Sequence, residues 1–215
     1  MSDIRKNMRD LRRDFNFGTF DPSQAPADPF QLLKAWLQDA IDLKVKDANA
    51  FVLSTVNDGF PDSRVLLIRD ISDQEIHFYT NYQSKKAMDI ESNPQVSMNV
   101  FWPDLERQIR IHATLSKLSE QLSDDYFKTR PRASQIGAWA SSQSQALASR
   151  EELESRIAHY EQEFEGREVQ RPPHWGGYAA SPKYLEFWQG RPNRLHDRIS
   201  YQKTDGAWQT GRLYP

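Results

Sequence analysis

The stretch Leu185–Arg198, which reads LEFWQGRPNRLHDR, concentrates side chains that can recognise an anionic ring compound. It places Trp188, Arg194, His196 and Arg198 close together in the chain. Arginine supplies fixed positive charge and directional donors, and histidine titrates near neutral pH. A strand, a Gly-Arg-Pro turn and a second strand would bring these side chains together, which suits a phosphorylated small molecule beside a flat ring. A surface hairpin with a solvated, charged edge accounts for the same residues about equally well.

A second group of candidate residues lies in Tyr79–Lys86, YTNYQSKK. An expected strand ends in polar groups that include Tyr79 and Thr80, and a helix then begins with Lys85 and Lys86 in its first turn. Lysines at a helix start oppose the helix dipole, whereas the free backbone N–H groups there attract an anion. A bound phosphate would remove this conflict. Two solvated lysines at a helix end are the alternative.

Two arginines bracket the apolar part of Asp62–Arg69, DSRVLLIR. The run is apolar on both faces, so it predicts a central strand with Arg64 and Arg69 near its ends. An arginine in such a place needs a counter-anion or open solvent. Strict alternation puts the two side chains on opposite faces. For both arginines to take part in one binding site, the strand would need a bulge, the site would have to lie at a subunit interface, or two ligands would have to lie next to each other.

Tyr126, Arg130 and Ser134 follow one another at intervals of four residues. This spacing aligns them on one helical face, provided that Pro131 does not break the helix. Tyrosine, arginine and serine together can form a phosphate clamp. Each of them alone is more often an ordinary surface or boundary residue.

Three other polar residues are weaker candidates. The amide of Gln108 could read a ring carbonyl or imide, although a cross-strand structural role accounts for it equally well. Gln143 and Ser144 lie in the polar run 141–145, which most often is only a loop. The five histidines have no metal-ligand spacing, so the sequence predicts no metal site.

The elements that must position these residues are mostly β-strands. A helix is expected from Asp28, as N-cap, and Pro29, with Leu33, Trp36, Leu37, Ala40 and Ile41 facing the core. Expected strands span residues 51–56, 62–69, 75–80, 95–102, 106–117, 177–180, 184–189, 195–203 and 208–213. Further helices are expected at 84–92, from Ser119, at 134–140 and at 149–165, the last opened by a capping box at Ser149. Short turns between the strands indicate an antiparallel meander or a small barrel.

Composition limits the class of protein further. The chain has 215 residues, a formal net charge of −2 and no cysteine. The balanced charge argues against nucleic acid and anionic membranes as partners, and the lack of cysteine excludes disulfides and thiolate chemistry and fits a reducing cytoplasm. No apolar run approaches a membrane span or a signal core, so we expect a cytoplasmic protein. We expect a flexible basic arm at residues 1–28 and one domain at residues 29–215.

Taken together, these segments resemble the pyridoxamine 5′-phosphate oxidase family. The most specific evidence is LEFWQ followed by RLHDR within residues 185–198, which resembles the family signature. The agreement extends to RVLLIR, FYTNYQSKKA, LERQ, YFKTRPRASQIGAW and the closing RLYP. It runs from about Leu11 to Pro215.

The resemblance implies a mainly β fold with flanking helices, an FMN-binding split β-barrel of the antiparallel Greek-key type. It also implies a homodimer with FMN at the subunit interface. The cofactor-binding residues implied are Arg64, Val65, Leu66, Leu67, Ile68, Arg69, Tyr79, Thr80, Lys85, Lys86, Gln108, Gln143, Ser144, Trp188 and Arg198. The substrate-binding residues implied are Arg12, Arg69, Tyr126, Arg130, Ser134, Arg194, Leu195 and His196, of which Arg194 and His196 are the catalytic candidates.

Three positions depart from the family pattern. Arg69 stands where many members have lysine, which keeps the charge but changes geometry and hydration. Lys85 stands where arginine is frequent in the family, so the bidentate hydrogen bonding of a guanidinium group is lost. Phe15 aligns with a common tyrosine and loses a hydroxyl contact, while Arg12 aligns with a residue that can close over the substrate.

The activity implied is oxidation of pyridoxamine 5′-phosphate and pyridoxine 5′-phosphate to pyridoxal 5′-phosphate, with O2 as acceptor and H2O2 as product. One alternative is a non-catalytic split-barrel protein that binds FMN or pyridoxal phosphate. Another is a flavin reductase-like enzyme that uses a nicotinamide donor. The complete set of substrate-side residues argues against the non-catalytic alternative.

Overall fold

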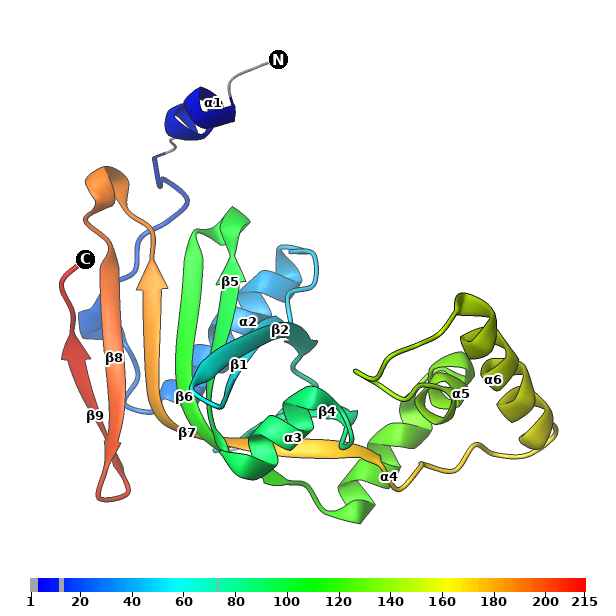
Figure 1. Ribbon diagram of the computed structural model, residues 1–215. Helices are drawn as coiled ribbons and strands as arrows, with labels where there is room; N and C mark the ends of the chain where they lie inside the picture. Colours follow the sequence, from blue (N-terminus) through cyan, green and yellow to red (C-terminus); the bar gives the residue numbers. More distant parts are fainter. Residues whose placement is uncertain (1–3, 12–13, 73) are drawn as a thin grey trace. The chain divides into compact units, whose positions relative to one another are not determined.

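The computed structural model describes residues 4–11, 14–72 and 74–215 (Figure 1). They form two compact units, each assembled from separate stretches of the chain. Unit 1 contains the described part of residues 1–48 together with Asn99–Ile111 and Tyr184–Pro215, and unit 2 contains Asn49–Met98 and His112–Lys183. Within the described ranges, no helix is long and apolar enough to cross a membrane.

In the described part of the chain, the strands form a nine-stranded sheet, and its mainly antiparallel character confirms the prediction from the sequence. They are β1 Ala50–Asn57, β2 Phe60–Leu67, β3 Asp70–Ile71, β4 Ile76–Asn81, β5 Gln95–Trp102, β6 Arg107–Lys117, β7 Trp175–Gln189, β8 Asp197–Thr204 and β9 Ala207–Arg212. The strand order is β2-β1-β5-β6-β7-β4-β3, with β8 pairing with β7 and β9 with β8. The very short strand β3 was not predicted.

The helices are α1 Ile4–Asp10, α2 Pro29–Asp42, α3 Lys85–Ser92, α4 Glu120–Thr129, α5 Arg132–Ala140 and α6 Arg150–Glu163. Short 3-10 turns within the described ranges are η1 Pro22–Gln24, η2 Pro103–Leu105 and η3 Pro192–Arg194. The predictions of α2 to α6 are confirmed within a few residues at each end. Helix α1 was not among the predicted elements, because it is too short to show helical periodicity in the sequence.

Helix α2 begins as its sequence predicts. The Asp28 carboxylate accepts a hydrogen bond of 2.9 Å from the backbone N–H of Phe30, and Pro29 occupies the first turn. The side chain of Trp36 is buried, but Ile41 is 54% exposed. The prediction that Ile41 faces the core is therefore wrong, because the buried stripe of the helix is narrower than its apolar residues suggest.

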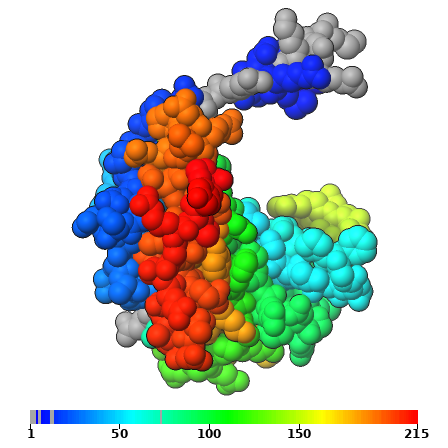
Figure 2. All heavy atoms as spheres, turned by 90° about the vertical axis from the view of Figure 1, so that its left-hand side faces the viewer, coloured from blue at the N-terminus to red at the C-terminus, as the bar shows by residue number. Residues whose placement is uncertain are grey.

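In unit 1, the two faces of β7 have different roles. Leu185 and Phe187 are fully buried, and the Phe187 ring packs edge-on against Trp36 of α2 at 5.3 Å between centroids. The alternate residues Glu186 and Trp188 point to the other face. Figure 2 shows the neighbouring strands β8 and β9, in orange and red, on the surface of this unit.

Strand β7 corrects the prediction of two separate strands at 177–180 and 184–189. The sequence Ser181-Pro182 reads as a strand breaker, yet β7 is continuous. Its pairing with β4 ends at Ala180, and its pairing with β8 begins at Tyr184. Pro182 lies between these two ladders, so its missing N–H removes no hydrogen bond from either of them.

In unit 2, β2 lies at one end of the strand order, so the prediction of a central strand is wrong. Val65 is 65% exposed. Ile68 N–H still donates to Asn49 O in register with the β1 ladder, but Arg69 N–H donates to His77 O of β4, so the chain changes its partner strand at Arg69. Leu66 and Arg69 line one cavity, although strict alternation would put them on opposite faces. Strict alternation therefore does not extend from Arg64 to Arg69, and the expected conflict between opposite faces does not arise.

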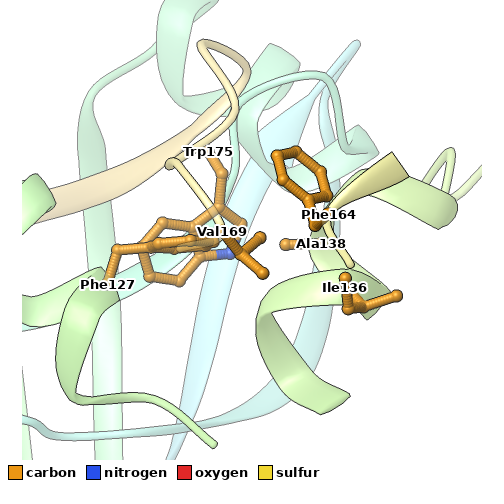
Figure 3. Close-up of a cluster of buried hydrophobic side chains, with 6 residues drawn as sticks. All are labelled: Phe127, Ile136, Ala138, Phe164, Val169 and Trp175. Atoms are coloured by element: carbon orange, nitrogen blue, oxygen red, sulfur yellow. The ribbon is translucent and has the colours of Figure 1, made fainter. Parts of the chain in front are cut away.

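The helices of unit 2 pack around a small apolar cluster (Figure 3). Its buried members come from α4, α5, the segment between α6 and β7, and the first residue of β7: Phe127, Ile136, Ala138, Phe164, Val169 and Trp175. Helix α6 begins with Ser149, whose hydroxyl accepts a bond from Glu152 N–H at 3.3 Å. The Glu152 carboxylate accepts a bond from Ala148 N–H. In an ideal capping box the glutamate accepts from the backbone N–H of the N-cap residue, here Ser149, whereas Glu152 accepts from that of the preceding residue, Ala148.

Candidate functional site

A buried lysine marks the start of α3 in unit 2. The Lys86 ammonium donates to Thr80 Oγ1 at 3.3 Å, to Ser84 Oγ at 3.2 Å and to Gln143 Oε1 at 3.0 Å. No carboxylate of the described chain lies within 4.0 Å of it. Burial, with a smaller contribution from the nearby charge of Arg64, lowers the pKa of Lys86 to about 8. A buried amine without a counter-ion is a donor in need of an anion.

A network of ion pairs holds the cations beside it. The Arg64 guanidinium lies 3.0 Å from the Asp62 carboxylate and 3.7 Å from that of Asp89, and it donates to Thr55 Oγ1 at 2.8 Å. Lys85 donates to Asp62 at 2.9 Å, and this bond lowers the pKa of Asp62 and raises that of Lys85. These contacts orient the two cations before any ligand binds.

No side chain caps the start of α3. Ser84 is the N-cap residue, but its hydroxyl donates to Asn81 O at 2.7 Å instead of accepting a bond from the helix. The uncapped helix start and the two lysines of the first turn therefore make a site that favours a phosphate.

A cavity of about 380 Å³ lies in the same unit. Its walls come from the end of β2, from β4, from α4 and α5 and from the start of β7, with these lining residues: Leu66, Arg69, Tyr79, Thr80, Asn81, Tyr126, Arg130, Ser134, Gly137, Ala138, Ser141, Gln143 and Trp175. One wall is a stack of parallel aromatic rings. Tyr79 lies 3.9 Å from Tyr126 and 5.6 Å from Trp175 between ring centroids.

Two guanidinium groups face this aromatic wall. Arg130 lies 4.5 Å above the ring of Trp175, and Arg69 lies 6.0 Å from the ring of Tyr126. Nη1 of Arg130 is buried and has no hydrogen-bond partner, and burial lowers the pKa of the group. Neither arginine has a carboxylate within ion-pair distance in the part of the chain that the structure describes. The cavity is therefore suited to an anion.

The sequence predicted correctly that Tyr126, Arg130 and Ser134 would come together, but for the wrong reason. Tyr126 lies in α4 and Ser134 in α5, and the helix is broken at Arg130 and Pro131. The three residues converge on the cavity from two helices and the turn between them, not from one helical face.

In unit 1, His196 packs between aromatic rings. Its ring centroid lies 4.5 Å from that of Trp188 and 5.2 Å from that of Phe15. The backbone N–H of Arg191 donates to His196 Nδ1 at 3.1 Å, so a neutral imidazole carries its proton on Nε2. Burial, and then the charges of Arg194 and Arg198, lower the pKa of His196. The ring is therefore a neutral donor at pH 7.

Arg194 lies on the turn between β7 and β8. The turn has two successive left-handed residues, Asn193 with φ 57° and Arg194 with φ 64°. The Arg194 guanidinium lies 5.9 Å from the Phe15 ring. Leu195, which follows it, is 68% exposed.

The remaining candidate residues have simpler surroundings. Gln108 is half-buried on β6 in unit 1, Ser144 has a left-handed φ of 72° in unit 2, and Gln143 is tied to Lys86. Arg12 lies outside the described residues. The candidates therefore fall into two groups, one in each unit.

Sequence reasoning missed two residues that support the site. Glu186 is buried and holds Arg198, and its signal was a charged residue inside the apolar run LEFW. Trp175 supports Arg130 in the cavity wall, and no feature of the sequence marked it. Among the residues described, no group of three or more histidine, aspartate or glutamate side chains could hold a metal ion.

The fold is of the split β-barrel class, and its basic, aromatic-lined groups suit anionic ligands. PhzG from Burkholderia lata 383, solved with tetrahydrophenazine-1-carboxylic acid, matches with a TM-score of 0.87 at 30% identity, covering 92% of this chain and 98% of that one. A pyridoxamine 5′-phosphate oxidase-related, FMN binding protein from Nostoc punctiforme matches with a TM-score of 0.69 at 16% identity, covering 92% and 100%. The latter supports the fold alone.

Sequence comparison identifies the family. Residues 37–164 match the family model described as pyridoxamine 5′-phosphate oxidase, and residues 175–215 match the pyridoxine 5′-phosphate oxidase C-terminal dimerisation region. The pyridoxine/pyridoxamine 5′-phosphate oxidase of Rubrobacter xylanophilus is 45% identical over 98% of both chains. That of Actinobacillus pleuropneumoniae is 44% identical over 97% of this chain and 100% of the relative. The chain belongs to the pyridoxine/pyridoxamine 5′-phosphate oxidase family, as its sequence indicated.

Proposed function

We propose that this protein oxidises pyridoxamine 5′-phosphate and pyridoxine 5′-phosphate to pyridoxal 5′-phosphate with FMN as cofactor. The observation that carries the proposal is the cavity with Arg69 and Arg130, two guanidinium groups without a carboxylate partner among the described residues. A substrate phosphate supplies the missing anion, and Tyr126 and Ser134 add hydroxyl groups to the same cavity.

The residues at the start of α3 fit the phosphate of FMN. Lys86 is a buried amine without a carboxylate partner in the described chain, and Arg64 and Lys85 add two oriented cations. When bound there, FMN would supply the redox chemistry, namely acceptance of a hydride from C4′ of the substrate and transfer of the electrons to O2 to give H2O2.

The protein's own residues bind and orient the reactants. Arg69 and Arg130 hold the substrate phosphate, and Arg194 holds the pyridine ring so that C4′ faces the flavin. His196 donates from Nε2 to the ring, because its Nδ1 is engaged by Arg191 N–H. Trp188 and Arg198 contact the flavin, together with Gln108, Gln143 and the backbone of residues 65–69.

The proposal includes a homodimer, which the match of residues 175–215 to a dimerisation region supports, with FMN at the subunit interface. It also includes the flexible arm at residues 1–28, the FMN-binding domain at 29–215 and a cytoplasmic location. The absence of cysteine supports the last of these.

One experiment tests the activity against its alternatives. The purified protein is examined for a flavin spectrum and then mixed with pyridoxine 5′-phosphate in air, while pyridoxal 5′-phosphate and H2O2 are measured. We expect both products in equal amounts. A yellow protein that forms neither product would indicate a carrier, and a flavin that is bleached only by a nicotinamide would indicate a reductase.

A further inference from the structure

Glu186 is a buried carboxylate with no role in the proposed reaction. It is 2% exposed and lies between the fully buried Leu185 and Phe187. A buried charge is tolerated only when it is paired and fully hydrogen-bonded. Its partners therefore indicate what this carboxylate does.

The two carboxylate oxygens of Glu186 have separate partners. Oε1 accepts two bonds from Arg198, from Nε at 2.9 Å and from Nη2 at 2.7 Å. Oε2 accepts from Arg110 Nη1 at 3.0 Å and from the Tyr184 hydroxyl at 3.0 Å. Among the described residues, Oε1 therefore bonds to Arg198 alone, and Oε2 connects the carboxylate to Arg110 on β6 and Tyr184 on β7.

The strand register brings these groups to one face of the sheet in unit 1. Trp188 pairs directly with Arg198, and Glu186 pairs with Ser200, two positions along the same ladder. Because side chains alternate along a strand, Glu186 shares its face with Trp188, and Gln108 shares a face with Arg110. The Arg110–Glu186 bond shows that these faces of β6 and β7 are the same. Trp188, Gln108 and Arg198 are the residues of this unit that we assign to the flavin.

The end of the chain holds Arg198 from another direction. Arg198 Nη1 donates to the carbonyl of Tyr214 at 2.6 Å, and Leu213 N–H donates to the carbonyl of Arg198 at 3.2 Å. Three of the five N–H groups of the guanidinium are then used by the protein. The second hydrogens on Nη1 and Nη2 stay available for a ligand.

We propose that Glu186 is a positioning residue that orients Arg198 toward the flavin, an inference that rests on the proposed function. Its single negative charge is matched by two arginines, so the group of Glu186, Arg110 and Arg198 keeps one net positive charge. That charge is held on a rigid strand pair and favours the electron-rich ring of a reduced flavin. Glu186 acts through Arg198 and does not touch the ligand.

A double-mutant cycle on FMN affinity tests this role. FMN dissociation constants are measured by quenching of flavin fluorescence for the wild type, Glu186→Gln, Arg198→Met and the double variant. Glutamine keeps the shape of the side chain but removes its charge. We expect Glu186→Gln to weaken FMN binding about tenfold in the wild type, the effect of a lost charge-assisted bond. In the Arg198→Met background the same change should have less than about a twofold effect.

Tyr184→Phe is the matched control, because it removes a bond to the other oxygen of the same carboxylate. We expect it to leave FMN affinity within about twofold of wild type. Equal weakening by Glu186→Gln in both backgrounds would overturn the proposal, and so would a Tyr184→Phe effect as large as that of Glu186→Gln. If Glu186→Gln does not fold, Glu186→Asp, which keeps the charge on a shorter side chain, replaces it in the cycle with the same criteria.

The cycle also separates this proposal from the proposed function. A wild-type protein that binds no FMN contradicts the proposed function itself. A wild-type protein that binds FMN and oxidises pyridoxine 5′-phosphate, but shows an additive cycle, contradicts only the role of Glu186.

Discussion

FMN binding should weaken as the pH rises, and replacement of Lys86 by an uncharged residue should abolish this dependence. In the flavin-free protein, burial holds the pKa of Lys86 at about 8, well below the ordinary 10.5. A phosphate beside the ammonium stabilises the charged form and returns the pKa toward its ordinary value. In the proposed site FMN binds the protonated lysine, so we expect its affinity to fall as the pH rises above 8.

The magnitude follows from the two pKa values. Between about pH 7.5 and pH 9.5 the protonated fraction of free Lys86 falls steeply, while in the complex the lysine stays charged. The linkage relation then gives an increase of about 20-fold in the FMN dissociation constant, or about 1.8 kcal/mol. The stability of the flavin-free protein should change in the opposite direction. Burial of the charged Lys86 lowers the stability of the folded protein by about 3 kcal/mol at pH values below 8. This loss becomes smaller as the pH rises from 8 toward 10.5, because the folded protein then releases the proton while the unfolded chain still holds it.

Flavin fluorescence titrations across this pH range measure the effect. Lys86→Met should bind FMN more weakly at the lower pH and show almost no further loss at the higher pH. Lys85→Met is the matched control from the same helix turn. Lys85 is half-exposed and its bond to Asp62 raises its pKa, so its loss lowers affinity but leaves the pH dependence in place. A wild-type affinity that is independent of pH, or an unchanged slope in Lys86→Met, would refute the reasoning.

Three further variants test separate parts of the structure. Arg194→Ala should lower kcat for pyridoxine 5′-phosphate by about 100-fold, because ring orientation is lost; FMN affinity should stay near wild type, and unchanged turnover would contradict the assignment. Arg130→Met should raise KM by about tenfold or more with a smaller change in kcat. Arg132→Met is its control, because Arg132 donates to the carbonyls of Phe164 and Arg167 and affects stability alone. Asp28→Ala should lower the free energy of unfolding by about 1 kcal/mol in urea denaturation, and a loss near zero would show that the cap is dispensable.

Local signals in the sequence predicted most of the elements. Asp28 followed by proline marks a helix start because the cap and the fixed φ angle depend on neighbouring residues alone. The same holds for the β1–β2 turn, where Asp58 and Gly59 take the positive φ angles that a tight hairpin requires. Where a signal depends only on adjacent residues, the prediction was reliable.

The errors concern features that depend on distant parts of the chain. Whether an apolar run such as β2 is central or terminal in a sheet depends on which strands pair with it, and alternation carries no information about pairing. The sequence predicted two strands, at 177–180 and 184–189, where β7 is continuous, because the two ladders on either side of Pro182 cannot be seen in the sequence. The partners of Glu186 were invisible for the same reason, since Arg110 and Arg198 come from two other strands.

The turn that presents Arg194 has an unfavourable backbone. A left-handed conformation costs an ordinary L-residue about 1–2 kcal/mol, and Asn193 and Arg194 adopt it in succession. Asparagine tolerates this conformation well, whereas arginine does not. Glycine at position 194 would relieve the strain but would remove the guanidinium. With the role proposed for Arg194, selection for thermal stability and selection for turnover favour different residues at this position, and the turn carries the residue that the proposal assigns to turnover.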